Sequence, residues 1–350
     1  MTSTNLGPEA GEVRVRDFGE QALLQRLQRF CPPQIVGDDA AVLSVPSGRS
    51  LVATTDVLVD GVHFSLGLAS PDVRTTSPAD AGWRAAAANL SDLAAMGADS
   101  LGITVGLALP GETPIAWVEG LYEGLKACLD RYGGALLGGD VCRSPVLTVS
   151  ITALGSAIEG RILRRSAAQP GDVLVATGWH GASRAGLELL LHPERSREVA
   201  GPDRDRWIQA HQRPQPRLDV LPILAEICAE ISSQRAIAGM DSSDGLADAV
   251  LQICRASGVG AHLERDRLPI PPGLVEWVGL DQARQWTLYG GEDFELVLAL
   301  PKAIGDRLVQ RLGSPACVVG TITAEPQVQL IEAHHHPLET LSLDQGFQHF

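Results

Sequence analysis

Apolar residues recur along this chain with two periods, one typical of strands and one typical of helices. Short β-prone runs bounded by turn residues predict strands, and longer runs with apolar residues three or four apart predict helices. Strands are predicted at 51–64, 101–109, 135–137, 146–153, 172–178, 235–240, 261–263, 294–300, 317–322 and 328–330. Helices are predicted at 18–30, 77–96, 117–131, 182–191, 218–231, 246–256, 281–286 and 302–312. The pattern therefore predicts a protein of mixed helix and sheet.

The stretch from Gly37 to Phe64 organises this pattern. Two β-prone runs flank the turn-forming residues 46–48, so the stretch predicts a hairpin. Its carboxylates, among them Asp39 and Asp56, stand at the strand ends. Carboxylates held there suit hard cations such as Mg²⁺, which prefer oxygen ligands.

Three turns downstream also carry aspartates: 89–92, 138–140 and 241–245. The two glycines before Asp140 let the backbone approach a phosphate closely, although Gly-Gly-Asp alone is more often a plain turn. Residues 242–245 cap the following helix and aim its N-terminus at an anion. We therefore expect these segments to converge on one magnesium–polyphosphate site.

Asp92 comes late in its predicted helix, where the helix dipole disfavours an anion. Asn89, three residues earlier, shares its face. We therefore interpret Asp92 as a ligand compensated by a cation rather than as a solvated helix residue.

Size and composition limit the function classes. The 350 residues suffice for two domains, and a composition shift near 155–171 predicts domains at 1–155 and 156–350. The formal net charge of −14 argues against nucleic acid or an anionic membrane as the partner. No run reaches the roughly 18–20 apolar residues of a membrane span. A polar start and six scattered cysteines predict a cytoplasmic protein with reduced thiols.

Six motifs, in order along residues 17–350, resemble those of the thiamine-monophosphate kinase family, in the superfamily of aminoimidazole ribonucleotide synthetase. They are Gly37–Ala40, Thr54–Asp56 with His63–Phe64, Asn89–Ala98, Gly138–Asp140, Ser243–Leu246 and Gly290–Asp293. Each motif alone is weak, but six in order are specific. The resemblance implies phosphorylation of thiamine monophosphate by ATP to give thiamine diphosphate and ADP.

The resemblance also implies a two-domain α+β/α/β fold of the aminoimidazole ribonucleotide synthetase-like type. The N-terminal sheet-and-helix domain would bind ATP and Mg²⁺ and pair with a second copy in a homodimer. The C-terminal mixed α/β domain would complete the nucleotide and substrate site.

Single residues take roles from the same resemblance. The implied magnesium ligands are Asp39, Thr54, Thr55, Asp56, Asp92, Asp140, Asp241 and Asp244. Those expected to be catalytic are Asp56, Asp92, Asp140 and Asp244. The implied nucleotide contacts are Gly139, Asp140, Arg165 and Ser243, and the implied thiamine-phosphate contacts are His63, Glu292 and Phe347. The run 211–217 also resembles a family segment, whereas Ser242 stands where the family often has an apolar residue.

These residue types suit transfer between two phosphates. The acceptor would be a phosphate monoester whose second pKa is about 6, so it is largely dianionic at neutral pH and needs no general base. Several Mg²⁺ ions held by carboxylates would offset the charge repulsion and bridge donor and acceptor oxygens. No Gly-x-x-x-x-Gly-Lys-Ser/Thr loop occurs, which disfavours a P-loop kinase.

Some of these residues also have a purely structural interpretation. Arg165 is otherwise a surface arginine at a domain boundary, and His63 a satisfied structural histidine. Glu292 is otherwise a turn carboxylate, and Phe347 a lid on the core. The run His334–His336 is interpreted as an exposed loop rather than a metal site.

Other functions stay open at this point. A sister-family ATP-dependent synthetase or hydrogenase-maturation-type ATPase is the nearest, but such maturation proteins carry a C-terminal cysteine and this chain ends in Phe350. Selenophosphate synthetases carry a reactive cysteine near the N-terminus, and Cys31 lacks their Gly-rich setting. The third alternative is a non-catalytic metal–nucleotide sensor, which the intact aspartates disfavour.

Overall fold

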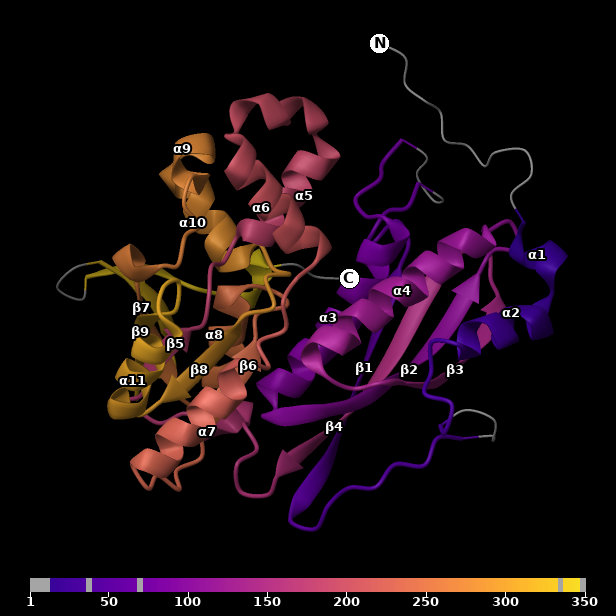
Figure 1. The fold of residues 1–350 in the computed structure, drawn as a ribbon. Coiled ribbons are helices and arrows are strands. Elements are labelled where there is room, and N and C mark those ends of the chain that lie inside the picture. Colours follow the sequence, from indigo (N-terminus) through magenta and orange to yellow (C-terminus); the bar gives the residue numbers. More distant parts are fainter. Residues whose placement is uncertain (1–12, 36–39, 68–71, 333–335, 347–350) are drawn as a thin grey trace. The chain divides into compact units, whose positions relative to one another are not determined.

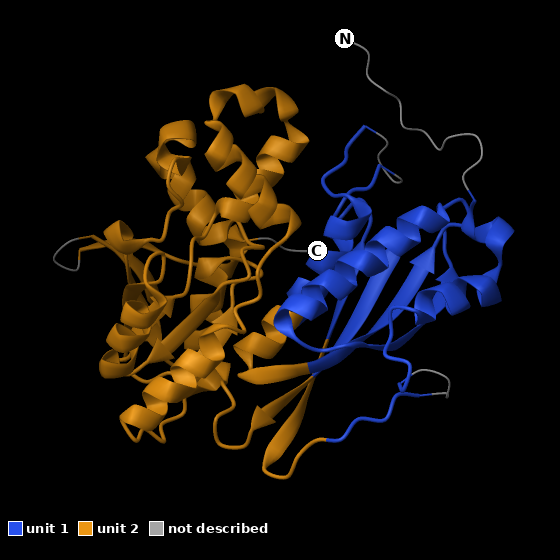
Figure 2. Ribbon diagram, in the orientation of Figure 1, with its two compact units in different colours: residues 1–44, 55–89, 101–154 blue, residues 45–54, 90–100, 155–350 orange. Residues whose placement is uncertain are grey.

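The chain folds into two compact units. The computed structural model describes residues 13–35, 40–67, 72–332 and 336–346 (Figure 1). Unit 1 comprises residues 1–44, 55–89 and 101–154, and unit 2 comprises residues 45–54, 90–100 and 155–350 (Figure 2). The described residues include no helix that is both long and apolar enough to cross a membrane.

A four-stranded sheet with the order β1-β4-β2-β3 carries several of the predicted site residues. Its strands are β1 Arg49–Val59, β2 Ala98–Leu109, β3 Leu136–Arg143 and β4 Thr148–Ile158. Along β1 the residues 51, 53, 55 and 57 are exposed, whereas 52, 54, 56 and 58 are partly or fully buried. Because successive strand residues point to opposite faces, Thr54 and Asp56 share the more buried face.

Helices α3 Pro78–Ala95 and α4 Ile115–Tyr132 lie side by side over this sheet (Figure 1). Glycines permit their close contact, because a Cβ at Gly82 would lie 1.9 Å from the carbonyl oxygen of Leu121. The bounds of α3 confirm the helix predicted at 77–96. The helix predicted at 18–30 is found as α2 Glu20–Gln28, and a single turn, α1 Val15–Phe18, precedes it.

Two sequence-based expectations for this region are wrong. Residues 40–46 form no strand, and the neighbour of β1 is β4, so the predicted hairpin does not form in the described residues. Val42 in that run is 90% exposed, so it has no sheet face against which to pack. Residues 138–140 are predicted as a turn but lie inside β3, parallel to β2. Gly139 suits this place because a Cβ would lie 2.1 Å from the carbonyl oxygen of Val105.

Unit 2 contains a mixed seven-stranded sheet with the order β11-β10-β7-β9-β5-β8-β6. Its strands are β5 Val173–Ala176, β6 Ala238–Asp241, β7 Gly260–Glu264, β8 Leu296–Leu300, β9 Cys317–Thr323, β10 Val328–Ile331 and β11 Pro337–Thr340. Only the β7–β10 pair is parallel among the described strand pairs of this sheet. The exposed edge strand β11 was not predicted from the sequence.

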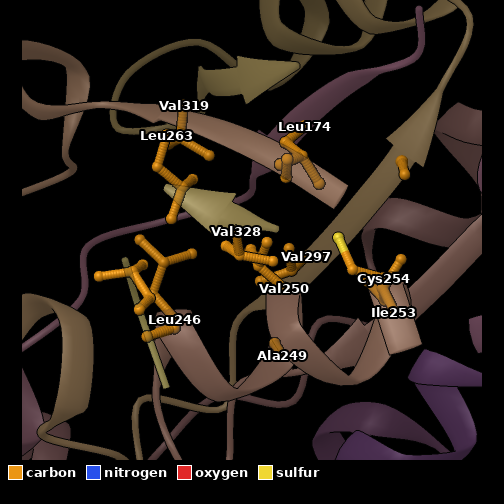
Figure 3. Close-up of a cluster of buried hydrophobic side chains, with 14 of the residues drawn as sticks. Leu174, Leu246, Ala249, Val250, Ile253, Cys254, Leu263, Val297, Val319 and Val328 are labelled. Atoms are coloured by element: carbon orange, nitrogen blue, oxygen red, sulfur yellow. The ribbon is translucent and has the colours of Figure 1, made fainter. Parts of the chain in front are cut away.

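Helices cover both faces of this sheet, which makes three layers. Leu174 of β5 and Val297 of β8 pack with α8 Leu246–Ser257 (Figure 3). Val173 and Leu298 follow or precede these residues in their strands and point to the opposite face of the sheet. They pack with α7 Val220–Glu230 and α11 Lys302–Leu312. Strands buried on both faces read as continuous apolar runs, as 294–300 does.

A second cluster of helices packs around Trp207, which is fully buried. It consists of α5 Ala182–Leu191, α6 Gly201–Gln212, α9 Leu274–Val278 and α10 Leu280–Tyr289. The first half of α6 is rich in charged residues, and its Trp207 packs it against this cluster. The described part of the chain thus confirms the mixed α+β/α/β fold.

Candidate active site

Asp92, a predicted ligand in unit 2, lies in the last turn of α3. The hydroxyl of Thr54 donates a hydrogen bond to Asp92 Oδ2. Burial raises the pKa of Asp92, while the Thr54 hydrogen bond and the charge of Arg165 oppose that rise. A carboxylate whose charge is disfavoured by its surroundings is well suited to a bound cation.

Asp241 ends the buried strand β6 and faces the same segment. Ser91 Oγ donates a 2.9 Å hydrogen bond to Asp241 Oδ2, and Ser243 Oγ lies 3.5 Å from Asp241 Oδ1. Ser91 and Asp241 are both buried. The residue before Asp92 therefore ties α3 to the turn at 242–245.

The turn at 242–245 places Asp244 just before the start of α8. Gly245 has φ +109°, a left-handed conformation that suits glycine, and a Cβ there would lie 2.7 Å from the carbonyl oxygen of Leu288. One helical turn later, Asp248 is half-buried. Burial, followed by the charge of Asp244, raises the pKa of Asp248, while Arg165 lowers it.

Arg165 is the cation of this group, and its backbone is held by α8. Ser257 Oγ donates a 2.8 Å hydrogen bond to the carbonyl oxygen of Arg165. The same hydroxyl accepts a 3.1 Å hydrogen bond from the N–H of Ala168. Ser257 thus holds both ends of the short turn that presents Arg165.

The residues of unit 2 fit magnesium by their chemistry. The side-chain ligands on offer are carboxylate and hydroxyl oxygens, and two of the carboxylates, Asp92 and Asp248, have raised pKa values. Within the described ranges, no group of three His, Cys, Asp or Glu side chains could hold a metal ion by itself. Mg²⁺ is commonly bound by one or two carboxylates together with substrate phosphates and water, which matches this sparse set.

Unit 1 carries three further predicted ligands on its sheet, Thr55, Asp56 and Asp140. Asp56 follows Thr55, whose Oγ1 lies 2.9 Å from Thr152 Oγ1. Gly139 and Asp140 line a cavity of about 640 Å³, whose wall is continued by apolar residues such as Leu27 and Leu137. This cavity places a carboxylate and an exposed glycine backbone beside an apolar wall.

His63 lies just beyond β1 and is half-buried. Its Nδ1 accepts a 3.1 Å hydrogen bond from the N–H of Val59. The neutral ring therefore carries its proton on Nε2, which makes that atom a hydrogen-bond donor. One ring nitrogen of His63 thus makes a structural hydrogen bond, as the structural interpretation expects. The other nitrogen has the chemistry to contact a phosphate.

Glu292 stands in a strained segment of unit 2. Its φ is 61°, and that of Phe294 is 53°, in the left-handed region that side chains rarely adopt. Between them, Asp293 accepts hydrogen bonds from the N–H groups of Gly181 (2.6 Å) and Ser183 (2.9 Å) at the start of α5. Burial raises the pKa of Asp293 to about 7.

Two predicted residues, Asp39 and Phe347, lie outside the described residues, as do His334 and His335 of the histidine run. In unit 2 the structure brings together Thr54, Asp92, Asp241, Ser243, Asp244 and Arg165. Sequence reasoning missed Ser91, Ser257 and Asp248. Only Asp248 had a usable signal, because it follows Asp244 by four residues on one helix face.

Two family models match the chain in order. The AIR synthase related protein N-terminal domain matches residues 37–157, and the corresponding C-terminal domain matches residues 169–332. The thiamine-monophosphate kinase of Synechococcus elongatus is 52% identical over 334 residues, which are 95% of this chain and 97% of that protein.

Solved structures agree with this result. The crystal structure of thiamine-monophosphate kinase from Stenotrophomonas maltophilia K279a has a TM-score of 0.74 and 33% identity, covering 88% of this chain and 95% of that one. AaThiL complexed with AMPPCP and TMP has a TM-score of 0.67 and 28% identity, covering 92% and 96%. The chain therefore belongs to the AIR synthase related proteins and, within them, to the thiamine-monophosphate kinase family.

Proposed function

We propose that this chain transfers the γ-phosphoryl group of ATP to the phosphate of thiamine monophosphate, giving thiamine diphosphate and ADP. The observation that carries the proposal is the oxygen-only group around Asp92, Asp241 and Asp244, with Arg165 as its cation, in a chain of this family. Because a dianionic acceptor phosphate needs no base, an acidic group without a nucleophile–base pair suits this reaction.

Nucleotide contacts are predicted in each of the two units. The cavity beside Gly139 and Asp140 suits the base and sugar, because it combines an apolar wall with polar groups. Arg165 would bind phosphate oxygens through its planar guanidinium, and Ser243 through its hydroxyl at the start of α8.

Magnesium would be held by the carboxylates and hydroxyls that the sequence predicts, including Asp39, which lies outside the described residues. When bound, Mg²⁺ would supply positive charge that offsets the repulsion between the two phosphates. Asp56, Asp92, Asp140 and Asp244 would supply the carboxylate oxygens that hold the ions.

The acceptor would be recognised by its two ends. His63 donates from Nε2 to the phosphate, and Glu292 offers a carboxylate to the positively charged thiazolium ring. Phe347 stays a prediction for the same ring.

A homodimer in the cytoplasm completes the proposal. The edge strand β1 exposes Leu51 (55%) and Val57 (49%) on the same face. A long strand with exposed apolar residues at a sheet edge favours pairing with another chain, and a second copy is the partner we propose. The six free cysteines fit a reducing compartment.

A coupled assay with ATP, Mg²⁺ and either thiamine monophosphate or free thiamine tests the reaction. We expect ADP and thiamine diphosphate only with the monophosphate. Phosphorylation of free thiamine instead would reject the proposal, and ATP hydrolysis that ignores both compounds would favour the sister-family synthetase or ATPase.

Two variants test the site. Asp56→Asn and Asp140→Asn should abolish turnover while the circular dichroism spectrum and melting temperature stay near those of the wild type. Asp306→Asn, on the exposed face of α11, is the matched control and should keep full activity. Wild-type rates in both site variants would contradict the metal site.

A further inference from the structure

A buried histidine lies beside the strained segment that carries Glu292. His211 lies in the last turn of α6 and is 1% exposed. Its Nδ1 lies 3.1 Å from Ser183 Oγ and 3.7 Å from Glu292 Oε2. The imidazole therefore packs between the start of α5 and a carboxylate that is one-third exposed.

The backbone of Glu292 is fixed independently of this histidine. Its N–H donates a 2.6 Å hydrogen bond to the carbonyl oxygen of Ser243, in the turn that precedes Asp244. Gly291 has φ +68°, and a Cβ there would lie 2.9 Å from that same carbonyl oxygen. A non-glycine residue with positive φ costs free energy, and such strain persists where the surroundings enforce it, often at functional sites.

Ser183 connects the two neighbours of Glu292. Its N–H donates to Asp293 Oδ1 at 2.9 Å, and its hydroxyl meets His211 Nδ1. Asp293 in turn caps α5. Ser183 therefore contacts both Asp293, which neighbours Glu292, and His211. Of the groups joined here, the Glu292 carboxylate is the one that reaches solvent on a third of its surface.

We infer that His211 is a positioning residue that holds the Glu292 carboxylate for a cationic ring of the acceptor. The inference rests on the proposed function and names a determinant of its substrate specificity. A thiazolium ring has a permanent positive charge and no N–H on its charged nitrogen, so a carboxylate recognises it by charge. Coulomb attraction falls with distance, so the carboxylate must be held close to where the ring binds.

Turnover of thiamine monophosphate and of its analogue with a neutral thiophene ring tests this inference. The preference of the wild type for the cationic ring, measured as the ratio of kcat/KM values, should fall about tenfold in His211→Ala. The KM for ATP should stay within about twofold. Glu292→Gln should lose the same preference, and the double variant should lose no more than Glu292→Gln alone.

His211→Leu, which fills the same space without a polar group, should lose the preference as His211→Ala does and serves if His211→Ala does not fold. His211→Gln, which keeps a polar group at the same place, should restore most of the preference. His192→Gln, an exposed histidine beyond α5, is the matched control. An unchanged ring preference in whichever of His211→Ala and His211→Leu folds, or equal increases in both KM values, would overturn the inference. If the wild type ignores thiamine monophosphate altogether, the proposed function fails first, so the two failures are distinguishable.

Discussion

Ser91 and Asp241 are 150 positions apart in the sequence, yet Ser91 Oγ donates a 2.9 Å hydrogen bond to Asp241 Oδ2. Both residues are buried, so water cannot replace the bond easily. The contact joins the end of α3, which carries Asp92, to the end of β6, which carries the Asp241–Asp244 turn. Within unit 2 it sets two predicted ligand segments against each other, as the Thr54–Asp92 hydrogen bond does for β1 and α3.

Ser91→Ala should therefore weaken both the fold and the site. Removing the hydroxyl leaves a buried carboxylate oxygen without this donor, which costs about 1–3 kcal/mol of unfolding free energy. We also expect a higher Mg²⁺ concentration for half-maximal activity. Urea denaturation and a magnesium titration measure the two effects, with the exposed Ser47→Ala as control. An unchanged magnesium requirement would separate Ser91 from the site.

Asp92→Asn should stabilise the fold and abolish turnover. Burial raises the pKa of Asp92, so its charged form costs folding free energy at pH 7, whereas asparagine is neutral. In EDTA we expect the melting temperature to rise by on the order of 1–3 °C. Thr54 would retain a partner in the amide oxygen. A lower melting temperature in EDTA would show that the Asp92 charge is stabilised by the protein itself.

Ser257→Ala should raise the KM for ATP and leave the KM for thiamine monophosphate unchanged. The hydroxyl makes two hydrogen bonds to the turn of Arg165, and their loss is worth about 0.5–1.5 kcal/mol each, or roughly 2- to 12-fold in affinity per bond. Ser257→Thr keeps the hydroxyl and is the matched control. Steady-state kinetics with each substrate varied in turn provide the measurement. Equal effects of the two substitutions would argue against the hydrogen bonds as the cause.

Asp293 should make the stability of the fold depend on pH. Its pKa is raised from 3.8 to about 7 by burial, so the folded state binds more protons than the unfolded state between these values. The unfolding free energy should therefore fall as the pH rises from about 4 to about 7, by at most about 1.4 kcal/mol per pH unit. Above that range the contribution of Asp293 is constant.

Denaturation of the wild type and of Asp293→Asn between pH 4 and pH 8 checks this expectation. The neutral asparagine has no such titration, so the wild type should lose stability relative to the variant as the pH rises. Asp130→Asn, at an exposed ion pair with Lys126, is the control. Parallel pH profiles for wild type and Asp293→Asn would contradict the raised pKa.

Local pattern was sufficient for much of the fold. The helices at 182–191 and 302–312 have the bounds that their apolar spacing predicts, because that spacing follows from the helical repeat alone. It failed at residues 40–46 and 138–140. The first run has β-prone residues but no neighbouring strand, and the second is drawn into β3 by close pairing with β2.

The sequence by itself determined the family, the kind of chemistry and which aspartates to expect in the site, because motif order and residue type are properties of the chain alone. Tertiary structure decided the contacts that support those aspartates. Ser91 meets Asp241, Ser257 meets the turn of Arg165, and His211 lies beside Glu292. No period or motif encodes these pairs, since each depends on how strands and helices distant in sequence pack against each other.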